Sequence, residues 1–373
     1  MSDFIKALSV FVGTIIGVGI FGLPYVAAKT GFLVIIGYFL ILGAIAILIH
    51  LIYGDIILAT RGKCRFPGYV EKYLGKKWRR VAFLSIGVGL FGAQLAYLVV
   101  GGGFLAGLLM PYIGGSVLLY TLIYFAIGSL IIFKGIKHIS ITELIVLSLF
   151  FLLLIFFIIK GVGSVNINHL LTINLNNFIL PYGIILFSLW GSSILSEIKE
   201  IVKKDRKIFR KTIIAGIGIA VITYILFIFI VTGITGVETT EDAIQGLRSI
   251  MGNKIANLGF VFGLITCFSS YLTIGLTLKK IFWYDMKLKP NFSWAIAAFV
   301  PLILYLIGAR QFILIISLIG ALTLGVESFI KILMYKVFLK KKKKKINPLY
   351  YFLSALFLLG IVIEVLSQLG IIS

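Results

Sequence analysis

Eleven apolar stretches, each long enough or nearly long enough to cross a bilayer, constrain this chain more than any other feature. A transmembrane helix needs about 20 predominantly apolar residues, and 60% of the 373 residues are hydrophobic. The stretches cover residues 7–28, 31–59, 81–110, 115–133, 141–159, 178–196, 212–234, 257–278, 292–308, 312–338 and 348–370. The sequence therefore predicts an all-α polytopic membrane protein with eleven transmembrane helices.

The basic residues are distributed unevenly between the two sides that eleven helices define. Thirty of the 35 Lys and Arg fall on the side of the N-terminus. The opposite side has five, which are Lys29, Lys160, Arg248, Lys254 and Arg310. Cytoplasmic loops carry an excess of Lys and Arg, so we expect a multi-pass cell-membrane protein with a cytoplasmic N-terminus and an outer C-terminus. The run Lys340–Lys345 then predicts a contact with anionic lipid headgroups, and nucleic acid is not an expected partner.

The first apolar stretch contains the segment GTIIGVGIFGLP, residues 13–24, which has four glycines and one proline. Each interior Gly costs a helix about 1 kcal/mol relative to Ala, and Pro about 3 kcal/mol. A second weakened segment, FSLWGSS at residues 187–193, lies in the sixth stretch. We therefore expect helix interruptions near Gly17–Gly22 and near residues 187–193, although Gly13 and Gly17 also fit a small-residue packing surface.

The two predicted interruptions occupy corresponding places in two blocks of five helices. Because five is odd, the blocks have opposite orientations in the membrane. Unwound backbone at membrane depth is tolerated only where it lines protein or water, and paired interruptions of this kind are typical of transporter binding sites. A break exposes N–H groups that attract a carboxylate and C=O groups that attract an ammonium or a small cation, so the pattern favours a zwitterionic ligand.

The segment GTIIGVGIFGLPYVAAKTG resembles the first-helix signature of the amino acid–polyamine–organocation (APC) superfamily. The resemblance is strongest to its aromatic and hydroxy amino acid permease and amino acid/auxin permease branches. It continues in FPGYVEKYLGKK, AQLAYLVVGGG, LPYGIILFSLWGSSILSEIKE and TCFSSYLTIGLTLKK. It implies a LeuT-type 5+5 inverted repeat plus an eleventh transmembrane helix. The implied transport core is 1–338, with repeats at about 7–160 and 178–338, and the additional helix lies within 346–373.

The resemblance also implies a substrate site at the two interruptions and on the third helix. The implied substrate-binding residues are Gly17, Gly19, Ile20, Phe21, Gly22, Tyr97, Phe187, Ser188, Trp190 and Gly191. The hydroxyl of Tyr97 would bind the substrate carboxylate, and Tyr271 is a candidate wall residue. For each aromatic residue the alternative is a ring that faces lipid or the core.

The segments around this predicted site contain no Asp, Glu, Lys, Arg or His. A substrate with a charged side chain would need a counter-charge, so we expect a neutral amino acid with an apolar or aromatic side chain. Glu327 and Lys331, an i, i+4 pair on the tenth helix, are interpreted as structural. An inner gate formed by Glu197 and loop lysines is an alternative.

A possible cation site is indicated on the eighth helix, where Thr266, Ser269 and Ser270 share one face. Sodium-coupled members of the LeuT-type fold place adjacent hydroxyls beside the first-helix break, where carbonyls near Gly13 would complete the site. We therefore expect Na⁺ coupling. Proton coupling, which is general among bacterial aromatic amino acid permeases of this branch, and uncoupled exchange are the alternatives.

The sequence as a whole predicts a secondary active transporter of neutral amino acids that works by alternating access. Two other functions keep the same features: an amino acid sensor without net transport, and a carrier of another small zwitterion or amine. No catalytic residue, metal site or organic cofactor is expected, because no Cys/His spacing and no phosphate loop occurs. No pattern in the sequence indicates an oligomeric state.

Overall fold

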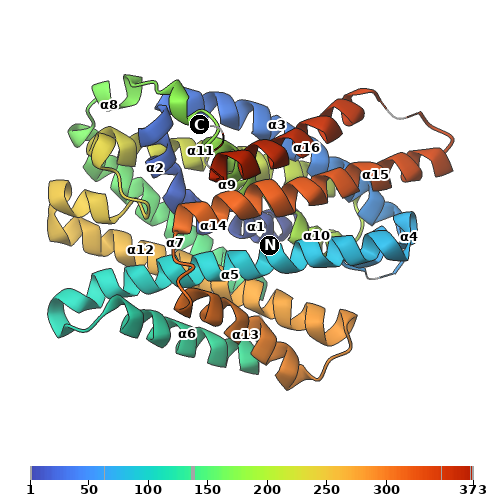
Figure 1. Ribbon diagram of the computed structural model, residues 1–373, viewed down its shortest axis with the longest axis horizontal. Coiled ribbons are helices and arrows are strands. Elements are labelled where there is room, and N and C mark those ends of the chain that lie inside the picture. Colours follow the sequence, from blue (N-terminus) through green and yellow to red (C-terminus); the bar gives the residue numbers. More distant parts are fainter. Residues whose placement is uncertain (1, 63, 136–138, 346, 370, 372–373) are drawn as a thin grey trace.

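A computed structural model describes residues 2–62, 64–135, 139–345, 347–369 and 371, and within these ranges the chain forms helices and loops without strands (Figure 1). Eight of the described helices are long and apolar enough to cross a membrane, and one bent pair makes a ninth. Two predicted spans fall below that length. The stretch 292–308 forms a helix of 17 residues, and the stretch 178–196 is divided between two short helices.

The first block of helices follows the predicted order. Its elements are α1 (Asp3–Ile15), α2 (Gly19–Thr30), α3 (Phe32–Ala59), α4 (Phe66–Leu74), α5 (Lys76–Ile113), α6 (Val117–Lys134) and α7 (Ile139–Gly161). A short α8 (Asn168–Leu171), flanked by 3-10 turns at Val162–Ser164 and Leu175–Asn177, leads to the second block.

The second block repeats the pattern of a divided first helix followed by long helices. Its elements are α9 (Pro181–Ser188), a 3-10 turn at Ser192–Ile194, α10 (Leu195–Ile201), α11 (Arg206–Thr235), a 3-10 turn at Gly236–Glu238, α12 (Gln245–Lys280), a π-helix at Ile281–Asp285, α13 (Pro290–Leu306), α14 (Phe312–Leu318), a π-helix at Ile319–Leu324 and α15 (Gly325–Lys341). The final helix, α16 (Leu349–Gln368), packs on α15.

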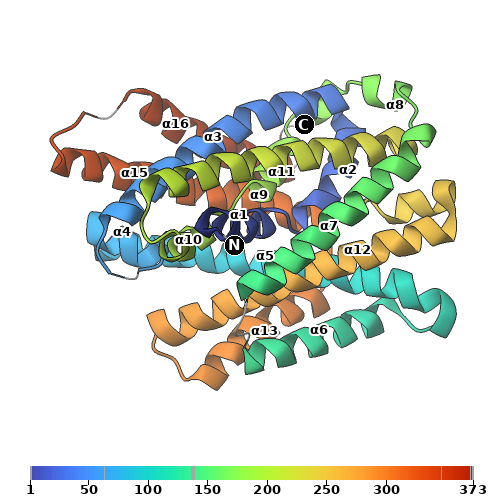
Figure 2. The same cartoon turned by 180° about the vertical axis from the view of Figure 1, so that it is seen from behind.

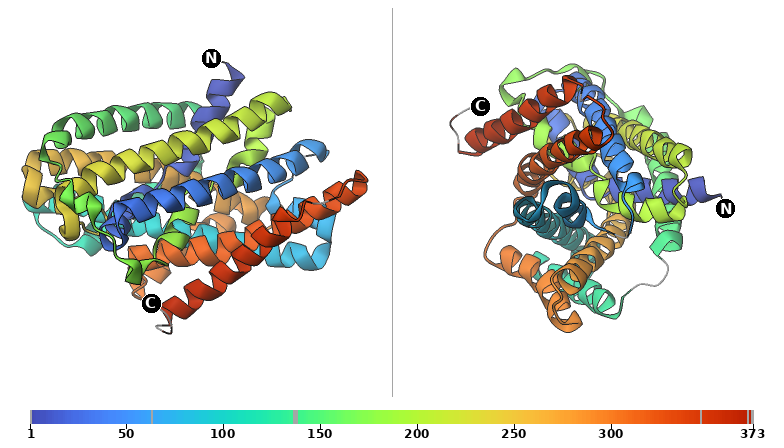
Figure 3. Two further views of the ribbon diagram at one scale, coloured as in Figure 1. Left: turned by 90° about the horizontal axis from the view of Figure 1, so that it is seen from above. Right: turned by 90° about the vertical axis from the view of Figure 1, so that its right-hand side faces the viewer.

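The connecting segments gather at two opposite ends of the helix bundle (Figures 1 and 2). α4, the turn between α12 and α13 and the turn between α15 and α16 lie at one end, which is the end predicted to be cytoplasmic. α8, the turn between α5 and α6 and the start of α12 lie at the other end. The N-terminal end of α1 projects from the side of the bundle (Figure 3).

The first interruption is shorter than predicted and begins one residue earlier. Only residues 16–18 lie outside the two helices, and α1 and α2 meet at an angle of 53°. The N–H of Ile20 donates to the carbonyl of Gly17 (3.3 Å) and the N–H of Phe21 to that of Val18 (3.1 Å). Because this turn closes at once, residues 19–22 belong to α2, and the prediction of a break extending to Gly22 was wrong.

The second interruption lies within the predicted segment. α9 ends at Ser188, and residues 189–191 separate it from the turn that leads into α10. α9 also lies against the π-helix Ile319–Leu324, where a Cβ atom on Gly320 would overlap the carbonyl oxygen of Gly183. The tenth predicted helix therefore packs against α9, just before the second break, with almost no space between the backbones.

Candidate substrate and ion sites

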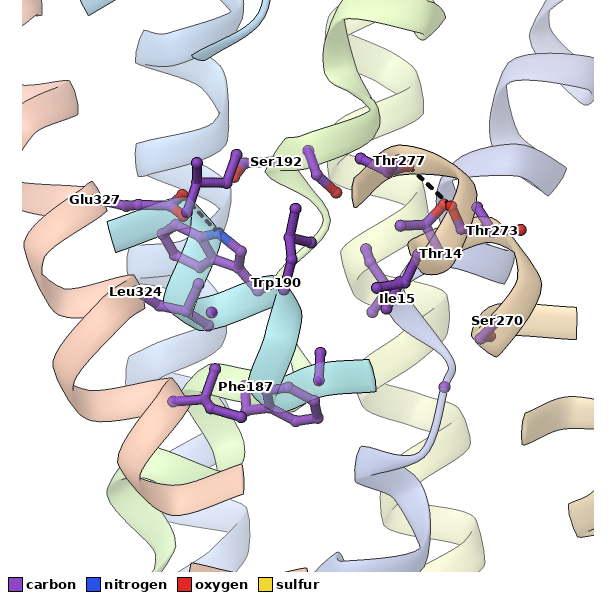
Figure 4. A pocket seen from close by; sticks show the side chains of 18 of the residues that line it. Thr14, Ile15, Phe187, Trp190, Ser192, Ser270, Thr273, Thr277, Leu324 and Glu327 are labelled. Atoms are coloured by element: carbon purple, nitrogen blue, oxygen red, sulfur yellow. Dashed lines mark hydrogen bonds between the residues drawn. The ribbon is translucent and has the colours of Figure 1, made fainter. Parts of the chain in front are cut away.

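One cavity lies where the two interrupted helices face each other (Figure 4). The lining residues from the two breaks are Gly13, Thr14, Ile15, Gly17, Gly19, Phe187, Ser188 and Trp190. Tyr97 from α5 also lines it. Trp190 lies on one side of the cavity, beside Glu327, and Thr14, Thr273 and Thr277 lie on the other (Figure 4).

Two glycines at the first break are needed because neighbouring side chains leave no space for a Cβ atom, and not because a turn demands an unusual backbone conformation. A Cβ atom on Gly17 would overlap the hydroxyl group of Tyr97, and a Cβ atom on Gly19 would overlap the hydroxyl group of Ser188. The missing side chains therefore bring the backbone of the first break directly against α5 and against the end of α9. Gly17 and Gly19 also line the cavity, so part of their backbone is within reach of a ligand there.

A tyrosine that the sequence did not single out joins the two breaks. The hydroxyl oxygen of Tyr224, on α11, lies 2.8 Å from the carbonyl oxygen of Ile15 and 2.8 Å from that of Ser188. Tyr224 has no exposed surface. These carbonyls end α1 and α9, so a single buried O–H donor serves the C-terminal ends of both first half-helices.

His50, on α3, contacts the second break directly. Its Nε2 accepts a hydrogen bond from the N–H of Gly191 (3.1 Å). Its Nδ1 lies 2.6 Å from the carbonyl oxygen of Ala46. Because Nε2 is an acceptor, the proton of the neutral ring is on Nδ1, which donates to that carbonyl. Nε2 thus holds the unwound backbone, and Nδ1 fixes the ring to its own helix, α3.

The prediction of a cavity without charged residues was wrong, because Arg65 and Glu327 line it. Each has a partner of opposite charge: Arg65 lies 3.7 Å from Glu197, and Glu327 accepts from Lys331 at 2.9 Å. Glu197 therefore pairs with a loop arginine, whereas the alternative of an inner gate named loop lysines as its partners. Glu327 is 137 residues from Trp190 in the chain, and only the packing of α15 against the second break brings it to the cavity.

Four of the predicted substrate residues do not line the cavity. Ile20 and Phe21 are fully buried in α2, and Phe21 packs edge-to-face on Phe104, Phe227 and Phe262. A Cβ atom on Gly22 would meet the side chains of α14, and one on Gly191 would meet those of α1. The candidate wall residue Tyr271 packs against Tyr124, and it does not line the cavity either.

The predicted cation residues surround a second, much smaller cavity of about 10 Å³. Its lining residues are Gly13, Ile16, Val146, Leu147, Phe150, Thr266, Ser269 and Ser270. This volume fits one water-sized particle. Gly13 and Ser270 line both cavities, so the small cavity lies directly beside the large one.

The sequence model of the Tryptophan/tyrosine permease family matches residues 1–373. The chain belongs to this family. It is a multi-pass membrane transporter of aromatic amino acids, not an enzyme. No curated protein sequence matches the chain.

Two solved structures share the fold of this permease. The crystal structure of MhsT in complex with L-phenylalanine has a TM-score of 0.71 and 16% identity, over 97% of this chain and 98% of MhsT. Mhp1, a nucleobase-cation-symport-1 family transporter in a closed conformation with bromovinylhydantoin bound, has a TM-score of 0.68 and 16% identity, over 94% of this chain and 81% of Mhp1. The predicted LeuT-type fold is confirmed.

The large cavity of the permease extends from the breaks toward the end of the bundle that carries α4. The lining residues there are Arg65 and Phe66 at the start of α4, Thr277 near the end of α12, and Ile281 at the start of the following π-helix. Ser193, just after the second break, lines the cavity and is exposed. The cavity therefore reaches the surface at the end that the distribution of Lys and Arg predicts to be cytoplasmic.

Proposed function

We propose that this permease binds a neutral aromatic amino acid between its two helix breaks and carries it across the membrane by alternating access, coupled to a cation. The observation that carries the proposal is the single cavity lined by Gly17 and Gly19 of one break and by Phe187, Ser188 and Trp190 of the other. Such a site lies between two half-helices that can tilt, as alternating access requires. The phenylalanine in MhsT supports an amino acid of this class.

Each group of the substrate has a suitable counterpart in the cavity. The positive N-terminal end of α2, at Gly17 and Gly19, and the Tyr97 hydroxyl suit the carboxylate. The C-terminal carbonyls of α9 suit the ammonium group. Phe187 and Trp190 offer aromatic surface to the side chain.

A neutral side chain fits the paired charges of the cavity better than a charged one. Arg65 faces Glu197, and Glu327 faces Lys331. A charged substrate would have to break one of these pairs or remain uncompensated. The Glu327–Lys331 pair is buried, so leaving one of its charges unpaired is strongly unfavourable. Tryptophan, tyrosine and phenylalanine avoid that cost.

Flux in proteoliposomes tests the proposed function. We expect saturable uptake of radiolabelled tryptophan or tyrosine, competition by phenylalanine, and no competition by lysine or glutamate. Binding of an aromatic amino acid without uptake under any ion gradient would support a sensor instead. Preference for an amine without a carboxylate would support a carrier of another small zwitterion or amine.

Na⁺ is the proposed coupling ion, and the small cavity beside Gly13 is its proposed site. Thr266, Ser269 and Ser270 supply hydroxyl oxygens there, which are ligands that a small hard cation prefers. The α7 residues that line this cavity are Val146, Leu147 and Phe150, so no lysine ammonium from the described part of α7 replaces the cation. Proton coupling and uncoupled exchange are the other outcomes of the test.

Uptake with an imposed Na⁺ gradient at equal pH on both sides distinguishes the coupling ions. If uptake follows the Na⁺ gradient, Ser269→Ala and Ser270→Ala should each raise the Na⁺ concentration that gives half-maximal uptake. Ser249→Ala is the control, because Ser249 is an exposed hydroxyl on the same helix and lines neither cavity. Uptake that ignores Na⁺ and follows a pH gradient would refute the sodium site.

The arrangement of the chain in the membrane is also a proposal. We infer a transport core over residues 1–338, with inverted repeats at about 7–160 and 178–338, and an additional helix within 346–373. The Lys and Arg distribution supports a cytoplasmic N-terminus and an outer C-terminus in the cell membrane. A reporter inserted in residues 340–345 should be inside the cell and one fused after residue 373 outside. Reporters on the same side would contradict this topology.

A further inference from the structure

Among the described residues that line the large cavity, Glu327 on α15 supplies the one carboxylate. Its Oε2 atom accepts from Nζ of Lys331 (2.9 Å) and from Nε1 of Trp190 (3.3 Å; Figure 4). Its Oε1 atom accepts from no described group, and it is not one of the fully enclosed polar atoms that lack a partner. The side chain is 6% exposed, so Oε1 offers an unused acceptor to the cavity.

The two partners of Oε2 hold the carboxylate in place as an anion. The side chain of Lys331 has no exposed surface, and its Nζ lies 4.1 Å from the ring centroid of Trp190 and 5.0 Å from that of Phe66. These aromatic faces stabilise the ammonium charge beside the carboxylate. A hydrogen bond to an ionised acceptor is roughly twice as strong as one to a neutral acceptor. Oε1 is therefore a strong acceptor at a fixed position.

The ammonium group of Lys331 limits which donors suit Oε1. A cationic side chain on a substrate would bring a second positive charge next to that ammonium group, which already neutralises Glu327. A neutral N–H or O–H group adds no charge and completes the hydrogen bonding of the carboxylate. The site therefore favours a neutral donor over a cation.

Aromatic and aliphatic surfaces surround this acceptor. Trp190, which contacts the same carboxylate, and Phe187 line the cavity, as does Leu324, three residues before Glu327 on the same side of the chain. A substrate ring that packs on these side chains turns an edge toward Glu327. Tryptophan has an N–H group and tyrosine an O–H group on the edge of the ring, whereas phenylalanine has neither.

The hydroxyl groups on the opposite side of the cavity are weaker acceptors. The hydroxyl of Thr14 donates to the carbonyl of Val10 (2.8 Å), and that of Thr277 donates to the carbonyl of Thr273 (2.9 Å). Each hydroxyl proton is thus used within its own helix, and only neutral lone pairs remain for a substrate. Because Glu327 is charged, we expect a ring donor to prefer it.

We propose that Oε1 of Glu327 determines substrate preference by accepting a hydrogen bond from a neutral donor on the aromatic ring. Tryptophan and tyrosine supply that donor, and phenylalanine leaves Oε1 to water. This inference rests on the proposed function and narrows its substrate class to aromatic amino acids with a ring N–H or O–H group. Glu327 acts here as a specificity-determining residue, apart from the groups that bind the carboxylate and ammonium of every substrate.

Substrate analogues test the proposal in the unaltered protein. Competition against radiolabelled tryptophan in detergent compares tryptophan with 3-(3-benzothienyl)-L-alanine, in which sulfur replaces the indole N–H in a ring of nearly the same shape. The analogue should bind about tenfold more weakly, the loss expected for one hydrogen bond to a charged acceptor. In a second pair, 1-methyltryptophan, which lacks the N–H, should bind more weakly than 5-methyltryptophan, which has the same added methyl group and keeps it.

A double variant assigns the preference to Glu327. Glu327→Met is combined with Lys331→Met, because removing one member alone would leave a buried charge unpaired. The preference for tryptophan over the sulfur analogue should disappear, with the affinity for the analogue itself nearly unchanged. Glu364→Gln is the matched control and should keep the tenfold preference, because Glu364 is a buried carboxylate on α16 that accepts from Ser317 (2.6 Å) and does not line the cavity.

Other outcomes overturn the proposal. Equal affinity of the unaltered permease for tryptophan and the sulfur analogue would exclude a ring-donor contact, whether or not the double variant folds. Equal weakening of both ligands in the double variant would make the ion pair a support of the second break only. A preference that the double variant keeps and Thr277→Val loses would move the acceptor to the opposite side of the cavity.

The same measurements separate this inference from the proposed function. An intact donor preference without uptake in proteoliposomes would refute transport and leave the role of Glu327 in binding. Uptake of tryptophan and phenylalanine with no donor preference would refute the role of Glu327 and leave the transport function. Absence of any tryptophan binding would overturn both.

Discussion

The two helix breaks lie opposite each other, yet they are built from different chemistry. The first break, at residues 16–18, has Gly17 at its centre and Gly19 directly after it, and the side chains of Tyr97 and Ser188 fill the spaces beside these two glycines. The second break is braced by polar and charged side chains from three other helices. The backbone of the first break is therefore fixed by close packing, and that of the second by hydrogen bonds and an ion pair.

This difference matters for the two tasks of an alternating-access site. Close packing against glycine leaves little room for adjustment and favours a constant surface for the carboxylate group of any amino acid. Hydrogen bonds and charges can be made and broken by a proton or by a neighbouring helix. We therefore expect substitutions at the first break to abolish binding, and substitutions at the second to change stability, side-chain preference or coupling.

The largest effect is expected from Gly19→Val, which places bulk between the two breaks. Its Cβ would overlap the Ser188 hydroxyl, so tryptophan binding should fall below detection while the protein still inserts. Gly103→Val is the control, because a Cβ on this α5 glycine meets open space. Scintillation proximity with radiolabelled tryptophan measures both. Wild-type affinity in a folded Gly19→Val variant would show that the first break does not form the site.

Lys331→Met should destabilise the protein by about 3–5 kcal/mol, because it leaves Glu327 as an uncompensated buried charge. Lys336→Met, on the exposed part of the same helix, should have little effect. Unfolding in detergent, followed by tryptophan fluorescence or thermal shift, gives the comparison. Equal stability of the two variants would mean that the second break does not depend on the ion pair.

Tyr224→Phe should cost about 1–3 kcal/mol, since two buried carbonyls lose their donor. It should also weaken tryptophan binding, because both breaks lose a common support. Tyr38→Phe provides the comparison, as the Tyr38 hydroxyl serves the single carbonyl of Phe178 (2.7 Å) in an exposed setting. If the two variants behave alike, Tyr224 is not a support shared by the breaks.

The smallest effect is expected from Trp190→Ala, which should alter preference among substrates more than expression. Removing the ring deletes aromatic surface from the second break, so the ratio of tryptophan to phenylalanine affinity should change on the order of tenfold. Trp190→Phe should retain most of the wild-type ratio. Competition binding with the two amino acids measures it, and an unchanged ratio in Trp190→Ala would remove Trp190 from the side-chain pocket.

Local patterns in the sequence were sufficient to predict where the helices and the two breaks lie and that Thr266, Ser269 and Ser270 lie together. The length of an apolar stretch indicates a membrane span directly, because the helix must satisfy its own backbone hydrogen bonds within the bilayer. The clustered glycines indicated where the first break lies. They did not indicate its length, because the end of the break is set by two backbone hydrogen bonds, from the N–H groups of Ile20 and Phe21. The spacing of Thr266, Ser269 and Ser270 indicated that they share one helical face.

Only the tertiary structure showed which side chains brace the second break. Tyr224 reaches Ile15 across 209 residues, His50 reaches Gly191 across 141, and Trp190 reaches Glu327 across 137. The one signal available beforehand was the presence of His50, Glu327 and Lys331 at membrane depth, and an i, i+4 spacing gave the pair a sufficient local explanation. Periodicity describes a residue's place on its own helix, whereas the partner of a buried polar group is decided by which helices pack together.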